Sequence, residues 1–248
     1  MRGLENKVVV VTGSSGGLGQ AICKRLIAEG AKVVGLDLQR EQSATSPVFT
    51  QYAVDITNDP DVSAAVERIV AQFGSIDVLV NNAGWDSFGN FLDTDVETRR
   101  RIVDVNLHGV MNVLQAVLRR VVADGRSAKV VTIASDAGRV GSSGQSTYSA
   151  CKGGVIALTK TLARELARKG VTLNVVCPGP IRTPMLDNII ARGKGGGKVV
   201  DAMSNAIPLR RIAEPDDVVG MVAFLASDDA SYMTGQVISV SGGLTMHG

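Results

Sequence analysis

A tyrosine and a lysine near the middle of the chain have the types and spacing of a proton-transfer pair. Tyr148 and Lys152 are four residues apart, and Ser135 lies thirteen residues before the tyrosine. On a helix, this spacing places two side chains on one face, one turn apart. An ammonium group favours the ionised form of a neighbouring phenol, whose ordinary pKa is about 10. Such a tyrosine can exchange a proton with an alcohol near neutral pH, but the pair alone is weak evidence because chance helices often carry it.

A glycine-rich turn near the N-terminus can approach a phosphate group. Residues 12–19 read TGSSGGLG, follow a run of valines and open into a helical pattern. Glycines let the backbone turn tightly and come close to a pyrophosphate at the positive end of a helix. The spacing differs from the G-x-G-x-x-G fingerprint, and an ordinary strand-to-helix turn would read the same way. The candidate phosphate contacts are Gly13, Ser15, Gly17, Leu18 and Gly19.

An acidic residue at the end of the second apolar run favours a particular nucleotide. Asp37 lies eighteen residues after Gly19, where a carboxylate can hydrogen-bond both hydroxyls of an adenosine ribose. The same charge repels a 2′-phosphate, and no basic residue interrupts the glycine turn. We therefore expect NAD rather than NADP, the alternative being an exposed aspartate at a strand end. The candidate adenine contacts, at the end of the third run, are Asp55 and Ile56.

Apolar runs of five to seven residues alternate with longer helical patterns through most of the chain. Several of these runs are unbroken Val/Ile stretches, which are typical of strands buried on both faces of a parallel sheet. The alternation predicts one doubly wound α/β domain over residues 1–248. The predicted strands are 7–12, 32–37, 49–54, 76–81, 128–134, 171–177 and 236–240. The predicted helices are 18–29, 60–73, 96–123, 148–168 and 215–226, with a mobile glycine-rich loop at 192–198.

The overall composition excludes several classes of function. A net charge of +2 over 248 residues gives no argument for binding nucleic acid or an anionic membrane. No apolar run approaches the roughly eighteen residues of a membrane span, and the first predicted strand leaves no room for a signal peptide. Three scattered cysteines and two histidines make a poor metal set. We expect a reduced, cytoplasmic location and no bound metal.

Further motifs follow in an order that resembles one family over nearly the whole chain. Residues 81–84 read NNAG after the fourth predicted strand. The other motifs are the TGxxxGxG turn, Asn106, Ser135, Tyr148-x-x-x-Lys152 and Pro178-Gly179. This set strongly resembles the short-chain dehydrogenase/reductases. The resemblance implies an NAD(P) cofactor, a single-domain Rossmann fold with helices on both faces of a usually seven-stranded sheet, and a homotetramer. It adds the cofactor contacts Asn82, Ala83, Gly84, Pro178, Gly179, Ile181 and Thr183.

The resemblance also implies a role for each catalytic candidate. Tyr148 would be the acid/base at the substrate oxygen, and Lys152 would lower its pKa and hold the nicotinamide ribose. Ser135 would hydrogen-bond the carbonyl or alcohol oxygen. Asn106 would hold a water that links Lys152 to solvent, although its amide can at the same time satisfy backbone groups in a helix kink. Thr183 would contact the nicotinamide carboxamide and fix the ring face that donates hydride.

The implied reaction is the interconversion of a secondary alcohol and a ketone. In oxidation, Tyr148 takes the hydroxyl proton as hydride passes from the carbinol carbon to NAD⁺; in reduction, it returns the proton. Residues 85–86, 135–144, 177–180 and 241–246 look like the branch that oxidises alicyclic β-hydroxyacyl-CoA thioesters. The general layout also resembles the 3-oxoacyl carrier-protein reductases, which usually prefer NADPH. The alternatives are a dehydrogenase of free secondary alcohols, sugars or steroids, and a non-catalytic NAD-binding sensor.

The substrate pocket is the least determined part. We expect it to be built from Trp85 and Asp86, from residues 139–145, and from a substrate loop at about 184–212. Trp85, the only tryptophan, can wall this pocket or pack on the surface. The basic residues of the glycine-rich loop can attract the phosphates of a CoA thioester or simply be solvated; they are Arg192, Lys194 and Lys198.

Overall fold

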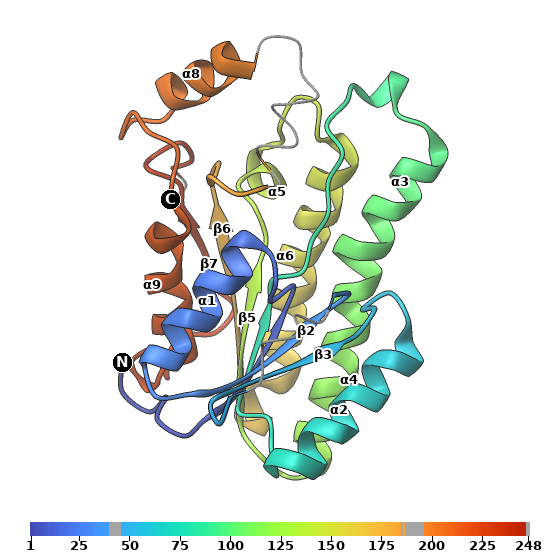
Figure 1. The fold of residues 1–248 in the computed structure, drawn as a ribbon, viewed down its shortest axis with the longest axis vertical. Helices are drawn as coiled ribbons and strands as arrows, with labels where there is room; N and C mark the ends of the chain where they lie inside the picture. The colour runs from blue at the N-terminus through green and yellow to red at the C-terminus, as the bar shows by residue number, and fades with distance from the viewer. Residues whose placement is uncertain (40–45, 185, 187–195, 247–248) are drawn as a thin grey trace.

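A twisted parallel sheet forms the centre of the molecule (Figure 1). The computed structural model describes residues 1–39, 46–184, 186 and 196–246. Within these residues a seven-stranded sheet has the order β3-β2-β1-β4-β5-β6-β7, and every neighbouring pair is parallel. The strands are β1 (Val8–Thr12), β2 (Lys32–Asp37), β3 (Phe49–Ala53), β4 (Val78–Asn81), β5 (Ala128–Ile133), β6 (Val171–Pro178) and β7 (Val237–Val240).

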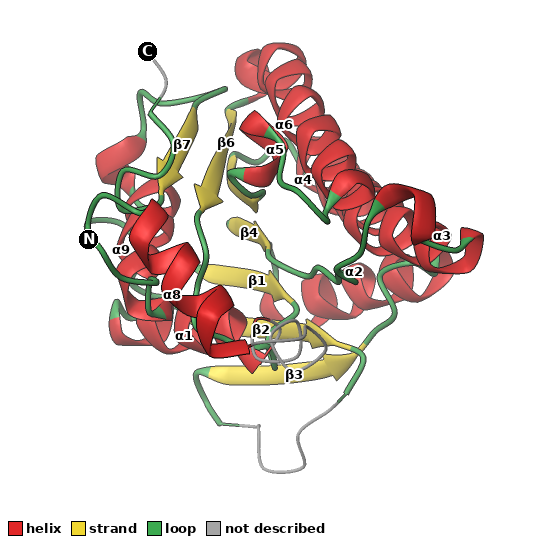
Figure 2. Ribbon diagram, turned by 90° about the horizontal axis from the view of Figure 1, so that it is seen from above, coloured by secondary structure: helices red, strands yellow, loops and turns green. Residues whose placement is uncertain are grey.

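Helices cover both faces of the sheet, as Figures 1 and 2 show. One face carries α1 (Gly17–Ala28) and α9 (Pro215–Ala226), and the other carries α2 (Asp59–Phe73), α4 (Gly109–Ala123) and α6 (Ser146–Leu166). The valines of β1 show why both faces need covering. Val8 and Val10 belong to the core under α2, α4 and α6, whereas Val9 and Val11 belong to the core under α1 and α9. The side chains of a strand alternate between faces, so a strand that is apolar at every position must be buried on both.

The strand order reverses at β1, which lies between β2 and β4. In open parallel sheets, the connections from neighbouring strands diverge at such a point and leave a crevice at the carboxyl ends. The glycine turn follows β1, and the NNAG segment begins at the end of β4. The topology therefore brings both sequence motifs to the same edge.

The doubly wound fold class predicted from the sequence is confirmed, and the strand positions agree to within one or two residues. The predicted helix 96–123 is instead divided into α3 (Val96–Val103), a π-helical turn at Asp104–His108 and α4. Asn106 occupies this turn, and its side-chain amide donates to the carbonyl oxygens of Ile102 at 2.8 Å and Trp85 at 2.6 Å. An apolar periodicity cannot reveal one extra residue in a helical turn, because the pattern continues on both sides.

Two helices were missed in the sequence: α5 (Ala137–Val140) and α8 (Gly196–Ala206). The predicted loop 192–198 overlaps the start of α8, so the prediction is wrong from Gly196 onward; residues 192–195 lie outside the described residues. Glycine is a poor helix former, and three in a row at the start hid the helix. Single-turn helices are Phe91–Asp93, Ala167–Lys169 and Asp228–Ala230. Among the helices that the structure describes, none has the length and apolar character that crossing a bilayer requires.

Candidate active site

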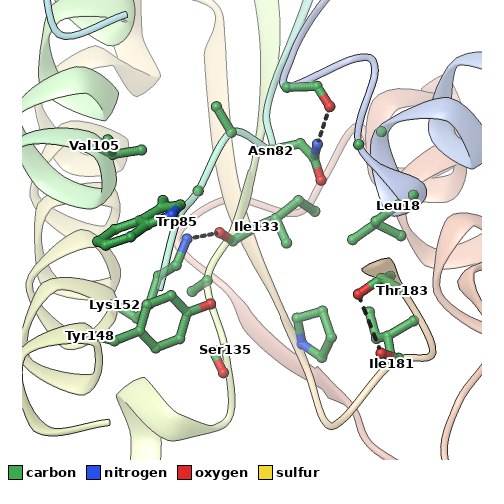
Figure 3. Close-up of a pocket in the computed structure, with 18 of the residues that line it drawn as sticks. Leu18, Asn82, Trp85, Val105, Ile133, Ser135, Tyr148, Lys152, Ile181 and Thr183 are labelled. Carbon is green, nitrogen blue, oxygen red and sulfur yellow. Dashed lines mark hydrogen bonds between the residues drawn. The ribbon is translucent and has the colours of Figure 1, made fainter. Parts of the chain in front are cut away.

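A cavity of about 780 Å³ opens at the carboxyl ends of the strands. It is lined by the glycine turn, by the ends of β2, β4, β5 and β6, and by the start of α6. Figure 3 shows Trp85, Lys152, Tyr148 and Ser135 on one side of it, with Leu18, Ile181 and Thr183 on the other. Of the catalytic and cofactor-binding residues predicted from the sequence, all except Asn106 line this cavity.

The glycine turn fits a close approach of backbone to ligand. Gly13 has a φ of +65°, and a Cβ at this position would lie 2.8 Å from the Cα of Ala83. A Cβ on Gly19 would lie 1.9 Å from the carbonyl oxygen of Gly13. The helix α1 has no acidic residue in its first turn and no side-chain cap. Its first N–H groups are therefore available to an anion in the cavity, and the helix dipole favours one there.

Asp37 ties the end of β2 to this turn. Its Oδ2 accepts a hydrogen bond from the backbone N–H of Ser15 at 2.9 Å, and its Oδ1 accepts one from the N–H of Gln39 at 3.3 Å. Its half-buried carboxylate faces the same cavity as the α1 N-terminus. A carboxylate can accept hydrogen bonds from a ribose diol but repels a phosphate in its place.

The next two strand ends complete this half of the cavity. The Oδ1 of Asp55 accepts hydrogen bonds from the N–H of Thr57 at 2.9 Å and its hydroxyl at 2.7 Å. The carboxylate is therefore fixed against its own loop. Asn82 donates from Nδ2 to the carbonyl oxygens of Thr12 and Gly13, both at 3.1 Å. Its amide thus holds the glycine turn in shape, while Ala83 and the rest of the NNAG segment line the cavity.

The helix α6 brings Tyr148 and Lys152 to the end of β5, next to Ser135 (Figure 3). The Lys152 Nζ donates to the carbonyl oxygen of Ile133 at 3.0 Å and lies 5.5 Å from the centroid of the Tyr148 ring. A Cβ on Gly84 would lie 3.5 Å from the same Nζ, so the NNAG glycine leaves room for the ammonium group. The Ser135 Oγ accepts the N–H of Ala137 at 3.1 Å, which leaves its own proton free to donate.

The electrostatics of this group differ from what the spacing alone predicts. Burial raises the pKa of Tyr148; the charge of Asp86 raises it further, and a hydrogen bond with Ser135 lowers it. Burial also lowers the pKa of Lys152 to about 8. A neighbouring ammonium alone would shift the tyrosine in the opposite direction, so desolvation outweighs it in this structure.

Asn106 lies outside the cavity, fully buried beneath the segment that carries Trp85. Besides its two donated bonds, its Oδ1 accepts the N–H of Trp85 at 3.3 Å. The side chain therefore satisfies the backbone at the helix kink. A role in holding a water near Lys152 stays a prediction, and the amide nitrogen has no spare proton for it.

The opposite wall of the cavity comes from the segment after β6. Thr183 lies next to Ile181, and its hydroxyl donates to the carbonyl oxygen of Ile181 at 3.5 Å. The backbone of this segment is held by Ala213, whose N–H donates to Pro180 at 3.1 Å. A Cβ on Gly17 would lie 3.1 Å from the Pro184 ring, so the turn and this segment are in contact.

The structure places part of the predicted substrate set in the cavity wall: Trp85, Val140, Gly141, Ser142, Gln145, Pro184, Leu186 and Met203. Trp85 lines it, and the guanidinium of Arg101 stacks on the indole ring 4.2 Å from its centroid. Asp86 lies behind this wall, and Arg139 points away to Ser239 at 2.8 Å. Arg192 and Lys194 lie outside the described residues, as does the side chain of Lys198.

Several lining residues were not predicted from the sequence. Some of them could have been predicted from their places at a strand end or beside a motif, because strand ends meet at this edge of the sheet. These residues are Leu38, Val105, Ile133 and Ala134. The others gave no signal in the sequence because they reach the cavity through side-chain packing; they are Phe88, Arg101, Leu244 and Thr245. Leu186 and Met203 fall within the predicted substrate loop at 184–212. No group of three or more His, Cys, Asp or Glu side chains that could hold a metal ion occurs in the described part of the chain.

Comparison with known proteins agrees with this geometry. A family model described as enoyl-(acyl carrier protein) reductase matches residues 13–245. The oxidoreductase UcpA of Salmonella typhimurium is 37% identical over 254 residues, covering 98% of this chain and 96% of that protein. The acetoacetyl-CoA reductase of an Acinetobacter species is 35% identical over 253 residues, covering 98% and 99%.

Among the solved structures that resemble this chain, some contain NADH and others contain NADP. A 3-ketoacyl-(acyl-carrier-protein) reductase from Brucella melitensis complexed with NADH has a TM-score of 0.88 and 31% identity, covering 98% of this chain and 100% of that one. ElxO with NADP bound has a TM-score of 0.88 and 28% identity, covering 96% and 98%. The chain therefore belongs to the short-chain dehydrogenase/reductase family, and it is an oxidoreductase that interconverts alcohols and ketones with a nicotinamide cofactor.

Proposed function

We propose that this protein is an NAD-dependent dehydrogenase that oxidises a β-hydroxyacyl-CoA, alicyclic or linear, to the 3-oxoacyl-CoA. The observation that carries the proposal is one cavity that contains Asp37 at the nucleotide end and Tyr148, Lys152 and Ser135 at the other. The first residue selects the cofactor, and the last three are the acid/base group.

The residues around the cavity fit a dinucleotide. The uncapped start of α1 suits a pyrophosphate, and the absence of a Cβ at Gly13 and Gly19 allows the backbone to approach it. Asp37 would hold the adenosine ribose and reject a 2′-phosphate, which favours NAD over NADP. Asp55 would meet the adenine with Ile56, and Thr183 would meet the carboxamide. When bound, the nicotinamide accepts or supplies the hydride.

The protein's own residues would then position the substrate and move its proton. Ser135 donates to the substrate oxygen and orients it toward Tyr148. The tyrosine takes the alcohol proton during oxidation and returns it during reduction. Lys152 would hold the nicotinamide ribose, and a protonated ammonium beside the tyrosine would favour the phenolate, against the effect of burial. Replacement of Tyr148 by Phe keeps the ring and removes the proton, so we expect about 10²–10⁴-fold slower turnover with NADH binding retained.

Two lines of support favour a CoA thioester. The acetoacetyl-CoA reductase of Acinetobacter matches over nearly its whole length. The segments 85–86, 135–144 and 241–246 resemble those of 2-hydroxycyclohexanecarboxyl-CoA dehydrogenases, and Trp85, Ser135, Ser142 and Leu244 line the cavity. Substrates change easily on this fold, so the assignment needs a direct assay.

The test is NADH formation from NAD⁺ with a panel of β-hydroxyacyl-CoAs, their free acids and simple secondary alcohols. Turnover confined to the thioesters is the expected result. Turnover of free alcohols, sugars or steroids alone would instead indicate a dehydrogenase of unactivated alcohols. A protein that binds NADH and oxidises no member of the panel, under conditions in which a related reductase is active, would indicate a cofactor sensor.

We also propose that residues 1–248 form one domain, with a substrate loop at about 184–212, and that four copies assemble. Leu186 and Met203 from this segment line the cavity. A second, apolar groove of about 600 Å³ lies between α4 and α6, lined by Met111, Leu118, Leu158 and Leu162 among others. An apolar groove of this kind on a helix pair is typical of a surface that packs against another subunit.

A further inference from the structure

A buried aspartate joins the segment after NNAG to the start of α6. Gln145 donates from Nε2 to the Oδ2 of Asp86 at 2.6 Å, and the N–H of Ser87 donates to Oδ1 at 2.9 Å. The N–H of Gly89 donates to the carbonyl oxygen of Gly144 at 2.9 Å, parallel to this side-chain bond. Asp86 is 8% exposed, so its carboxyl group is held in one position by both partners.

The contact with Asp86 determines which end of the Gln145 amide can bind another group. An ionised carboxylate only accepts hydrogen bonds, so Gln145 must present its NH₂ group to Asp86. The carbonyl oxygen Oε1 then points elsewhere, and no hydrogen bond to it occurs among the described residues. Gln145 lines the cavity three residues before Tyr148. The wall beside the reacting group therefore offers a hydrogen-bond acceptor.

The charge of Asp86 also reaches the reacting group. It raises the pKa of Tyr148 and of Lys152, while burial raises the pKa of Asp86 itself. Arg101 lies on the same side of the cavity as Trp85 and could attract an anionic substrate. Its guanidinium is exposed to solvent and stacked on the Trp85 ring. Solvent screens an exposed charge far more than a buried one, so the buried Asp86 acts on Tyr148 more strongly than Arg101 does.

We infer that Asp86 and Gln145 together select the substrate: they reject a carboxylate next to the reacting carbonyl and accept a neutral group that carries an N–H or O–H donor. The inference rests on the proposed reaction at Tyr148 and narrows its substrate class. The cysteamine arm of a CoA thioester is uncharged and carries an amide N–H, whereas a free β-hydroxy acid carries a carboxylate there. Asp86 acts as a positioning residue, through Gln145 and through its charge.

Three small ketones of nearly equal size separate the two effects. Acetoacetate is anionic, methyl acetoacetate is neutral without a donor, and acetoacetamide is neutral with one. Reduction of each by NADH gives kcat/KM ratios between substrates within one variant. A change in folding or in proton transfer at Tyr148 affects all three substrates and cancels in the ratios.

Asp86→Asn removes the charge. It also lets the Gln145 amide group flip, because an asparagine can donate to Oε1 as well as accept from Nε2. We expect the carboxylate-to-ester ratio to rise about tenfold, which a single buried charge can supply. Gln145→Leu removes the acceptor and leaves Asp86, so the amide-to-ester ratio is expected to fall severalfold while the carboxylate stays excluded. Asp93→Asn removes an exposed acid elsewhere and is the matched control, with unchanged ratios.

With NADH binding intact, a carboxylate-to-ester ratio within twofold of wild type in Asp86→Asn overturns the inference, and so does an amide-to-ester ratio within twofold of wild type in Gln145→Leu. If Asp86→Asn does not fold, the Gln145→Leu ratio decides alone. If the small ketones are reduced too slowly, the same three compounds are compared as competitive inhibitors of an alcohol that is turned over. The CoA thioesters are assayed separately. A shifted ratio without thioester turnover refutes the proposed substrate only, and thioester turnover with an unshifted ratio refutes this inference only.

Discussion

At the scale of single residues, the proposed acid/base pair is held at a cost in stability. Lys152 is 3% exposed, and within the described part of the chain its ammonium donates one hydrogen bond, to the carbonyl oxygen of Ile133, beside the ring of Tyr148. A buried cation with so few partners is destabilising at any pH at which it stays protonated. The site therefore keeps a poorly solvated, destabilising charge next to Tyr148. Such a charge is typical of a functional site.

Replacement of Lys152 by Met should stabilise the protein while it abolishes turnover. Burial lowers the pKa of this lysine to about 8 from its ordinary 10.5, so the folded state bears the cost of the charge below pH 8. We expect the variant to be more stable at pH 7 by on the order of 1–3 kcal/mol, offset in part by the unpaired Ile133 carbonyl. The advantage should shrink between pH 8 and 10.5, because the unfolded wild-type chain then binds more protons and wild-type stability rises.

The measurement for this variant is urea unfolding at several pH values between 7 and about 10. Lys160→Met is the control, since Lys160 lies on the same helix and is exposed. It should show no such pH-dependent gain. Burial raises the pKa of Tyr148, and loss of the neighbouring cation would raise it further, so the phenol keeps its proton in all three folded proteins over this pH range. A Lys152→Met variant that is less stable than wild type at pH 7 would contradict the argument.

Asp37 is expected to set the preference between NAD and NADP. Asp37→Asn keeps an acceptor for the N–H of Ser15 but removes the charge that would repel a 2′-phosphate. We expect the NAD-to-NADP ratio of kcat/KM to fall at least tenfold, measured with one alcohol at constant ionic strength. Asp55→Asn is the control, because that carboxylate is already committed to Thr57. If the NAD-to-NADP ratio of kcat/KM is the same in Asp37→Asn and Asp55→Asn, Asp37 does not set the cofactor preference.

At the scale of elements, strands were easier to predict than turns. Several buried strands are short runs of β-branched residues bounded by turn residues, such as VVVVT in β1, and their length and composition separate them from buried helices. The motifs fall at strand ends, so the topology alone gathers Gly13, Asp37 and Ser135 at one edge. The residues that the sequence did not indicate reach the cavity from far along the chain through side-chain packing, as Phe88 and Arg101 do.

The π-helical turn shows why single-residue geometry resisted prediction. Asn106 was singled out by resemblance, and the structure assigns its amide to the backbone of Ile102 and Trp85. Whether an asparagine binds water or backbone depends on distances of tenths of an ångström, which a motif does not contain. The Asp86–Gln145 contact has the same origin, since 59 residues separate its partners.

The turn between β1 and α1 is expected to tolerate no side chain at Gly19. A Cβ there would lie 1.9 Å from the carbonyl oxygen of Gly13, so Gly19→Ala must displace the turn from α1. We expect NADH affinity, measured by fluorescence titration, to fall at least tenfold while circular dichroism still shows a folded chain. Gly154→Ala is the control, because its Cβ would meet only Leu107 at 3.6 Å. NADH affinity within twofold of wild type in Gly19→Ala would contradict this.

At the scale of the whole molecule, the helix that carries Tyr148 and Lys152 also forms, with α4, an apolar groove on the surface. The groove between α4 and α6 is lined by leucines at successive turns of α6, Leu158, Leu162 and Leu166. The same helix presents Tyr148 and Lys152 to the cavity at its other end. Subunit packing on this groove would therefore fix the helix that positions the acid/base pair.

Met111 lines this groove and is 36% exposed, so it offers the mildest way to test subunit packing. Met111→Glu places a charge on an apolar surface, and each buried unpaired charge destabilises an interface by several kcal/mol. We expect light scattering to show a lighter particle than wild type, with lower turnover per chain because α6 loses its support. Leu92→Glu is the control, since Leu92 is 93% exposed on the single-turn helix Phe91–Asp93, away from the groove. If Met111→Glu keeps the wild-type mass at micromolar concentration, the groove is not the subunit interface, and the assembly must use another surface.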